Sequence, residues 1–491
     1  MLFNSFEYIA FLLAVFVLYW ACVRYARVAL GLLLVASLVF YASWSPWYLL
    51  LIVASTLVDY TCGRLLARTE ALGRRRLWLW VSVIYNLGVL ATFKYFNWFM
   101  EAIGDLVALV DARLAVPLLR PVLTGEAGYL ADSRLDFLLP VGISFFTFQS
   151  MSYTIDIYRR RLDPVRDYPR YLLYVSFFPQ LVAGPIVRAR DLLPQLLARP
   201  PLTDGMGARG LFLIGLGLLK KVAIADPLAI NIVDRVFETP AMYSSVELLM
   251  GVYGYAIQIY CDFSGYSDIA IGSALLLGFR FPDNFDAPYR ARDLQDFWRR
   301  WHISLSSWLR DYLYISLGGN RGGAWFTYRN LMLTMILGGL WHGAGWNFLI
   351  WGALHGVALA VQRAWQRYRE ARGQGPLLAG AFGQALAVVA TFHYVCFAWI
   401  FFRATTFEGA AAVLAGLAEG SLGTVNLTPL VLALIGAGFA THLCPRSLYE
   451  RAIATFGRWP AIVQAGCLVA VGFVLRELAV FEVVPFLYFQ F

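Results

Sequence analysis

The composition of the chain excludes a water-soluble globular protein. The chain has 491 residues, of which 60% are hydrophobic and 14% are charged, whereas a soluble domain carries about 25% charged residues. The formal net charge of +9 comes from short clusters of arginine and lysine between apolar runs. Such clusters are typical of the cytoplasmic loops of membrane proteins and not of a nucleic-acid-binding face. We therefore expect an all-α, polytopic integral membrane protein with no nucleic acid among its partners.

Apolar runs long enough to cross a membrane recur along the whole chain. In chain order, the clear runs are 8–23, 28–58 with a break near Ser45-Pro46, 77–99, 209–225, 245–260, 329–361, 378–402, 427–443 and 460–475. Weaker runs, which contain proline, glycine or charge and favour re-entrant or broken helices, are 137–157, 171–186 and 265–279. Together these runs predict about ten to thirteen membrane segments. We expect them to form one integral-membrane domain, residues 1–491.

The positive-inside rule predicts which side of the membrane the basic clusters face. The clusters expected on the cytoplasmic side are Arg74–Arg76, Arg159–Arg161, Lys220-Lys221, Arg299-Arg300 and 366–372. The longest polar connection, 280–330, has too many charges to lie in lipid, yet it is rich in tryptophan and tyrosine. This composition is typical of helices that lie at the membrane interface.

Histidine is scarce in this chain, which narrows the search for a residue that transfers protons near neutral pH. The five histidines are His302, His342, His355, His393 and His442. His342 stands in LGGLWHGAGWN (337–347), where glycine would let a substrate approach the backbone closely. The alternative is an incidental histidine at a glycine-lined helix crossing. Trp341, Trp346 and Asn347, from the same segment, are candidate substrate-binding residues.

His302 has a different setting, in the aromatic and basic part of the polar connection. Trp298, His302, Leu305 and Leu309 are spaced so that they would share one face of a helix. The spacing predicts an interfacial helix with one inward-facing histidine, and the alternative is an anchor helix with a packed histidine. We expect His355 to hydrogen-bond a neighbouring helix, and the alternative is a direct part in the chemistry. We expect His393 and His442 to be structural.

Two aspartates, Asp262 and Asp268, interrupt an apolar run. An aspartate at the centre of a bilayer costs about 2.5–3.5 kcal/mol, so each needs a charged partner or a wet cavity. Both residues are candidates for a substrate-binding cavity wall or for orienting a histidine. The alternative is a structural ion pair that fixes a broken helix.

Several other chemistries find no support in the sequence. The six cysteines form no C-x-x-C pair, and no metal site is predicted. The segment Gly318–Gly323 matches neither glycine-rich nucleotide motif, so we interpret it as a polar turn whose Arg321 could contact an anionic donor. No H-E-x-x-H or G-x-S-x-G pattern is present.

Several long motifs resemble the membrane-bound O-acyltransferase family. In chain order they are VGISFFTFQSMSYTIDIYR (141–159), FFPQLVAGPI (177–186), YCDFSGYSDIAIG (260–272), FPDNFDAPY (281–289), FWRRWHISLSSWLRDYLYISLGGNRGG (297–323) and LGGLWHGAGWNFLIWGALHG (337–356). A further segment, AWIFFRATTFEGA (398–410), is similar to the bacterial alginate O-acetyltransferase branch of that family. The resemblance covers a motif-bearing core of residues 140–410.

The resemblance implies a bundle of helices around a tunnel through the membrane. It implies that His342, in the WHG motif, is the principal catalytic residue and that His302 lines the cytoplasmic approach. A neutral His342 would then act as general base on an acceptor hydroxyl as it attacks an acyl thioester. By charge and position, Arg299, Arg300 and Arg321 would hold the phosphates of the donor at the cytoplasmic mouth.

The activity implied by the resemblance is O-acetylation of an extracellular or periplasmic polysaccharide by a multi-pass protein of the bacterial inner membrane. Acetyl-CoA would be the donor substrate, with no bound cofactor. Expected partners are periplasmic acetyl-relay or polysaccharide-acetylating proteins, membrane lipid and the polysaccharide acceptor. Within the family, D-alanyl transfer from a carrier-protein thioester to a cell-wall polymer stays open. Outside it, a secondary transporter would also contain broken helices and buried acids, although no internal repeat is visible.

Overall fold

The computed structural model describes residues 1–104, 139–182, 184–375, 378, 380–478 and 486–487. All regular secondary structure in these residues is helical, which confirms the expected all-α class. The longer helices are α1 (Phe6–Cys22), α2 (Ala26–Ala42), α3 (Trp47–Arg68), α4 (Leu72–Leu90), α7 (Ile143–Tyr158), α8 (Tyr168–Ser176), α10 (Ala189–Ala198), α11 (Asp204–Leu218), α14 (Ser245–Leu276), α17 (Ala324–His342), α18 (Trp346–Ala371), α19 (Gly380–Arg403), α20 (Phe407–Ala418), α21 (Pro429–Leu443), α22 (Arg446–Arg458) and α23 (Ala461–Leu478).

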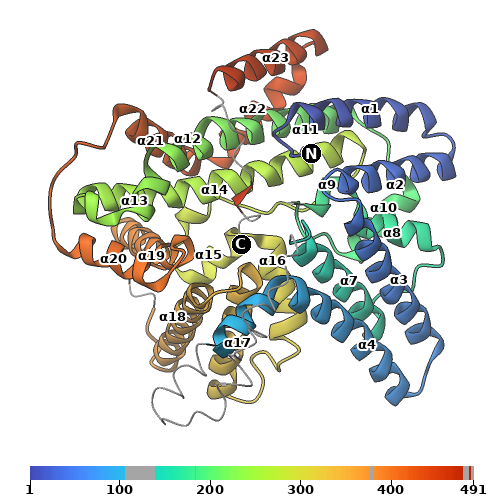
Figure 1. Ribbon diagram of the computed structural model, residues 1–491, viewed down its shortest axis with the longest axis horizontal. Coiled ribbons are helices and arrows are strands. Elements are labelled where there is room, and N and C mark those ends of the chain that lie inside the picture. The colour runs from blue at the N-terminus through green and yellow to red at the C-terminus, as the bar shows by residue number, and fades with distance from the viewer. Residues whose placement is uncertain (105–138, 183, 376–377, 379, 479–485, 488–491) are drawn as a thin grey trace, which may run out of the picture.

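Short helices connect the longer ones. They are η1 (Ala91–Tyr95), α9 (Phe178–Leu181), η2 (Leu219–Ala225), α12 (Asp226–Leu228), η3 (Ala229–Val233), α13 (Asp234–Glu238), η4 (Pro240–Met242), η5 (Pro288–Arg290), α15 (Leu294–Arg300), α16 (Ile303–Trp308) and η6 (Leu309–Tyr314). Figure 1 shows α14 running across the middle of the molecule. In this view α3, α4 and α7 lie below α14 to the right, and α18, α19 and α20 lie below it to the left.

Four helical segments of the described residues are long and apolar enough to cross a membrane. They are α3, the segment Leu72–Gly104 that contains α4 and η1, α19 and α23. The pair α21 and α22 passes the same test together but is bent by 94°. These are fewer than the apolar runs predict. The helices α1 and α2 are only 17 residues long each, and the run 329–361 is divided between α17 and α18, which are long enough but do not meet the test of apolar composition.

The helix α14 is a single element of 32 residues, about 48 Å long at 1.5 Å per residue. It joins the runs 245–260 and 265–279, which the sequence had separated. A capping box formed by Ser244 and Glu247 begins the helix. Its glycines allow α11 to pack against it at backbone contact, since a Cβ atom at Gly265 would lie 2.7 Å from the carbonyl oxygen of Gly217. The long central helix is therefore in close contact with α11 along its glycine positions.

The two lysines of the cluster at 220–221, which the sequence expects on the cytoplasmic side, are buried inside the bundle. Nζ of Lys221 lies 2.5 Å from Asp262 and 2.7 Å from Asp226, and Nζ of Lys220 lies 2.6 Å from Asp268. Buried charges are tolerated when each has a partner of opposite sign. The acids of α14 and the lysines of η2 thus neutralise one another inside the bundle.

The polar connection 280–330 folds as short helices and not as one amphipathic helix. The helix α15 ends at Arg300, and His302 has a left-handed backbone conformation with φ 43°. The expectation that Trp298, His302, Leu305 and Leu309 share a helix face is therefore wrong. The break is fixed by hydrogen bonds from Ile303 N to Asn284 O at 2.9 Å and from Asp286 N to Arg300 O at 3.0 Å.

Candidate active site

His342 is the last residue of α17, and its side chain is buried. Its imidazole is enclosed by aromatic rings, with centroids of Trp341, Trp351 and Phe402 at 5.0, 5.1 and 5.2 Å. The helix ends here because Gly343 is extended, and a Cβ atom at this glycine would lie 2.1 Å from the ring of Phe348. The sequence thus stops α17 at the histidine and packs the following turn against α18.

The glycines around His342 serve a close helix crossing. A Cβ atom at Gly339 would lie 2.2 Å from the carbonyl oxygen of Phe348, and one at Gly352 would lie 2.4 Å from that of Met335. Packing of α17 against α18 therefore accounts for these glycines. This is the alternative in which His342 stands at a glycine-lined helix crossing. The crossing also makes the position of His342 rigid.

His302 is fully buried between two motifs that are distant in sequence. Its Nδ1 atom lies 3.2 Å from Oδ1 of Asn284. The same oxygen accepts hydrogen bonds from the backbone N–H and the hydroxyl of Ser304 at 3.2 and 2.9 Å. Since a backbone N–H can only donate, this atom of Asn284 is an acceptor, and Nδ1 of His302 must carry the proton.

Trp341 connects the two motif histidines. Its ring centroid lies 5.0 Å from that of His342 and 6.0 Å from that of His302. Its indole N–H donates to the carbonyl of Ser144 at 3.4 Å, and its ring stacks on Phe148 at 5.4 Å. The structure therefore brings His302, His342 and Trp341 together from segments that are 40 residues apart.

His355 belongs to the same buried aromatic group. It lies 4.8 Å from Trp351 and 5.3 Å from Trp298, as ring-centroid distances, and it is fully buried. Within the described residues, neither ring nitrogen has a hydrogen-bond partner. The expected hydrogen bond to a neighbouring helix is therefore wrong within this part of the chain, because the neighbouring side chains are apolar ring faces.

The remaining histidines have structural surroundings, as expected. The Nε2 atom of His393 lies 2.7 Å from the hydroxyl of Tyr253, and its Nδ1 atom lies 2.8 Å from the carbonyl of Val389. His442 packs on the ring of Tyr260 at 4.2 Å, away from the two motif histidines.

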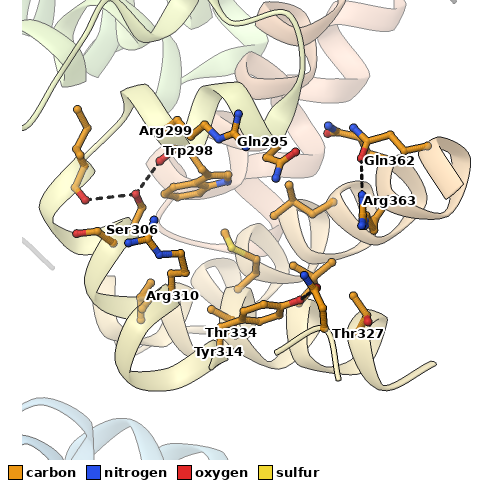
Figure 2. A pocket seen from close by; sticks show the side chains of 18 residues that line it. Gln295, Trp298, Arg299, Ser306, Arg310, Tyr314, Thr327, Thr334, Gln362 and Arg363 are labelled. Atoms are coloured by element: carbon orange, nitrogen blue, oxygen red, sulfur yellow. Dashed lines mark hydrogen bonds between the residues drawn. The ribbon is translucent and has the colours of Figure 1, made fainter. Parts of the chain in front are cut away.

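A pocket of about 510 Å³ opens beside the buried group. Figure 2 shows Trp298, Arg299, Ser306 and Arg310 on one side of it and Thr327, Thr334, Gln362 and Arg363 on the other. Its wall comes from α15, α16, η6, α17 and α18, and it combines a tryptophan face with three guanidinium groups. Since Trp298 also contacts His355, the pocket reaches the aromatic layer next to the histidines.

The three arginines expected to hold a donor are separated by the structure. Arg299 lines the pocket, whereas Arg300 is held by Asp296 at 2.8 Å and by Asp286 at 3.6 Å. Arg321 is not among the residues that line the pocket. Arg310 and Arg363 line the pocket beside Arg299. Neither could be predicted from the sequence, because the three arginines come from separate helices.

The other candidate substrate-binding residues also separate. Trp346 is 60% exposed and packs on Trp98 at 5.4 Å, outside the buried group. Asn347 is buried and donates to the carbonyl of Ala404 at 2.7 Å, which fixes the start of α18 to the end of α19. Asp262 and Asp268 lie in ion pairs with lysines, as the structural alternative predicts, but the helix α14 that carries them is not broken.

Comparison with known proteins shows which family the chain belongs to. Residues 159–402 match the membrane-bound O-acyltransferase (MBOAT) family. The chain is 40% identical over 427 residues to the probable alginate O-acetylase AlgI of Pseudomonas aeruginosa, which covers 82% of this chain and 76% of that protein. It is 37% identical over 489 residues to the probable alginate O-acetylase AlgI of Pseudomonas putida, with 94% of each chain covered. It is 38% identical over 412 residues to the peptidoglycan O-acetyltransferase of Helicobacter pylori, with 78% and 73% covered.

The all-helical fold with several apolar, membrane-length helices defines a membrane protein, and the comparisons give its family. The chain belongs to the membrane-bound O-acyltransferase family. It is therefore a multi-pass membrane enzyme that transfers acyl groups to hydroxyl acceptors, and its bacterial relatives include O-acetyltransferases.

Proposed function

We propose that this enzyme takes an acetyl group from acetyl-CoA at the cytoplasmic face of a bacterial inner membrane and passes it across for O-acetylation of an extracellular or periplasmic polysaccharide. The observation that supports this most is the burial of His342 at the end of α17, one tryptophan away from His302 and beside a basic pocket. We place these residues at the centre of a tunnel formed by about ten to thirteen membrane segments. Residues 140–410 would form the catalytic core of one domain that spans 1–491.

The proposed chemistry is nucleophilic attack on a thioester. His342 takes the proton from the acceptor hydroxyl while the oxygen attacks the thioester carbonyl. The new C–O bond forms, the C–S bond breaks, and the departing thiolate receives the proton from His342. The aromatic rings around His342 exclude water, so that the thioester is not hydrolysed.

His302 has a supporting role in this proposal. Because Nδ1 carries the proton, the lone pair of the imidazole is on Nε2, where it can accept a hydrogen bond. The ring of Trp341 contacts the rings of both His302 and His342, with centroids at 6.0 and 5.0 Å from its own. His302 would therefore line the donor path next to His342.

We place the donor in the pocket beside α15 and α18. Arg299 and Arg363 would bind the phosphates of acetyl-CoA, and the face of Trp298 would contact its apolar arm. Arg310 lines the same pocket but is paired with Asp311 at 2.7 Å. This replaces the set Arg299, Arg300 and Arg321, since Arg300 is committed to two acids. No cofactor is needed, because the donor thioester already carries the activated acyl group.

The acceptor in this proposal is a polysaccharide, as in the names of two relatives. Alginate and peptidoglycan are polysaccharides, and both appear in the names of relatives that match most of the chain. A periplasmic acetyl-relay protein would receive the group and pass it to the polymer, so the immediate acceptor would be a hydroxyl of that partner. Transfer of D-alanine is the weaker candidate, because the teichoic acid D-alanyltransferase of Bacillus subtilis is 30% identical over only 55% of this chain.

Turnover of acetyl-CoA by the protein in nanodiscs tests this function. Labelled acetyl-CoA is supplied with the periplasmic fraction of the source bacterium as acceptor, and release of free CoA and labelled product is followed. We expect turnover in the wild type and its loss in His342→Ala, with a smaller loss in His302→Ala. His393→Ala is the matched control and should keep the wild-type rate, since His393 contacts only Tyr253 and its own helix. Equal turnover in wild type and His342→Ala would contradict the proposal.

A further inference from the structure

Lys94 and Tyr95 lie on η1, directly after α4, and contact the end of α17. Nζ of Lys94 donates to the carbonyl oxygens of Trp341 and His342 at 2.8 and 2.7 Å. The hydroxyl of Tyr95 donates to the carbonyl oxygen of Leu340 at 2.6 Å. Figure 1 shows this light-blue part of the chain lying over α17. Two adjacent side chains thus bind three consecutive carbonyls that end at His342.

These carbonyls are the groups that a helix end leaves without partners. The last four C=O groups of an α-helix have no N–H to accept from, and they carry the negative end of the helix dipole. Gly343 is extended, so the chain does not fold back to satisfy them. An ammonium group at this place provides both hydrogen-bond donors and the opposite charge.

The helix that carries Lys94 is adapted to this contact. Residues 91–95 form a π-helical turn between α4 and the continuation of the same segment to Gly104. A π-helical turn adds a residue to the helix and rotates the side chains that follow it, and such turns are frequent at functional sites. A lysine in a membrane segment normally extends towards water, whereas Lys94 is directed at the backbone of His342.

We infer that Lys94, with Tyr95, is a positioning residue that holds the backbone of His342 and so fixes the orientation of its imidazole for acyl transfer. This inference rests on the proposed function of His342. Lys94 contacts the backbone of the histidine and no part of the donor pocket. Its loss should therefore lower the rate of the chemical step and leave donor binding intact.

The test compares Lys94→Met, Lys94→Arg and Tyr95→Phe in nanodiscs. Lys94→Met keeps the unbranched chain but removes the charge and the donors. We expect kcat to fall about tenfold to hundredfold, as small misplacements of catalytic groups do, with the KM for acetyl-CoA within twofold of the wild type. Lys94→Arg should recover part of kcat, and Tyr95→Phe, which removes one bond, should have the smaller effect.

Arg75→Met is the matched control. Arg75 is a buried cation on the same segment that also binds helix-terminal carbonyls, namely those of Leu66, Ile157 and Tyr158. Its loss should lower the unfolding temperature without lowering kcat of the folded protein. The inference is overturned if Lys94→Met keeps the wild-type kcat, or if it loses activity only in proportion to folded protein, as a merely structural cation would.

Hydrogen exchange separates this inference from the proposed function. In Lys94→Met, the amides of residues 340–347 should exchange faster than in the wild type, while those of α18 beyond this turn stay protected. If the rates of amide hydrogen exchange at this helix end are unchanged in Lys94→Met, the inference is contradicted, even if the enzyme uses an acyl donor other than acetyl-CoA. Failure of the proposed function is recognised differently, by turnover that does not depend on His342.

Discussion

Nδ1 of His302 lies 3.2 Å from Oδ1 of Asn284, and this contact determines which nitrogen of the histidine carries a proton. Asn284 is itself held by the backbone N–H of Ser304 and by the hydroxyl of Ser267, which lies 3.2 Å from its Nδ2 atom. The motif FPDNFDAPY thus orients the histidine of the following motif.

Replacement of Asn284 by leucine should impair catalysis more than folding. The change keeps the volume but removes the acceptor for Nδ1–H, so His302 can adopt the other tautomer and rotate. We expect kcat to fall about tenfold, because a misplaced His302 would disturb the geometry of the donor path next to His342. Turnover of labelled acetyl-CoA by the folded variant measures this, and Ser267→Ala is the control that removes only the contact to Nδ2. A wild-type kcat in Asn284→Leu would show that the tautomer of His302 has no role.

If the pocket binds acetyl-CoA, loss of the neighbouring residues Arg299 and Arg300 should affect the KM for acetyl-CoA differently. Arg299→Gln and Arg363→Gln should raise the KM for acetyl-CoA about fivefold to tenfold each, since an ion pair with phosphate contributes roughly 1–1.5 kcal/mol at a partly exposed site. Arg300→Gln should leave KM unchanged, because its guanidinium is bound to Asp286 and Asp296. Initial rates over a range of acetyl-CoA concentrations decide this. A larger effect of Arg300→Gln than of Arg363→Gln would move the donor site away from the pocket.

The buried charges of α14 predict a large loss of stability from a single change. Lys221→Met would leave Asp226 and Asp262 without their shared cation, and breaking a buried ion pair costs about 3–5 kcal/mol. Thermal unfolding in detergent should therefore occur at a clearly lower temperature. The triple variant Lys221→Met with Asp226→Asn and Asp262→Asn should recover part of the loss. If Lys221→Met unfolds at the wild-type temperature, the three charges do not form the network described here.

The dependence of the unfolding temperature on acidic pH should be influenced by Asp311, in the polar connection 280–330. Burial acts to raise the pKa of its carboxyl, but the hydrogen bonds from Arg310 and Arg188 outweigh burial and hold the pKa below its ordinary value. A carboxyl with a lowered pKa in the folded state stabilises that state above its unfolded pKa of about 3.9, and this contribution is lost as the pH falls further. Unfolding temperatures from pH 7 to pH 3 should therefore fall less steeply in Asp311→Asn than in the wild type. Parallel curves for the two proteins would contradict this assignment.

The fold class and the two motif histidines could be predicted because each leaves a local signal. Composition requires membrane segments, and the motifs around His302 and His342 are continuous in sequence. The helix boundaries were less predictable. Apolarity does not show that α14 continues through Asp262 and Asp268, because the lysines that neutralise these acids lie on another helix.

The site residues that could not be predicted are those that contact residues far away in the sequence. Asn284 acts on His302 across a chain reversal, Arg363 reaches the pocket from α18, and Lys94 meets His342 from 248 residues away. None has a local pattern that distinguishes it from an ordinary polar residue. Conversely, Arg300 and Trp346 stand close to motif residues in sequence, but the backbone directs them to other contacts.

The most direct test of the central claim is a transfer measurement in sealed inside-out membrane vesicles. Labelled acetyl-CoA is added to the outside, which is the cytoplasmic face, and a periplasmic acceptor fraction is enclosed within. If acetyl groups cross through the site around His342, label accumulates on acceptor inside the vesicles in the wild type, and none accumulates in a stably folded His342→Ala. Label that reaches the interior equally in His342→Ala, or that is transferred only to acceptors outside, would contradict the account.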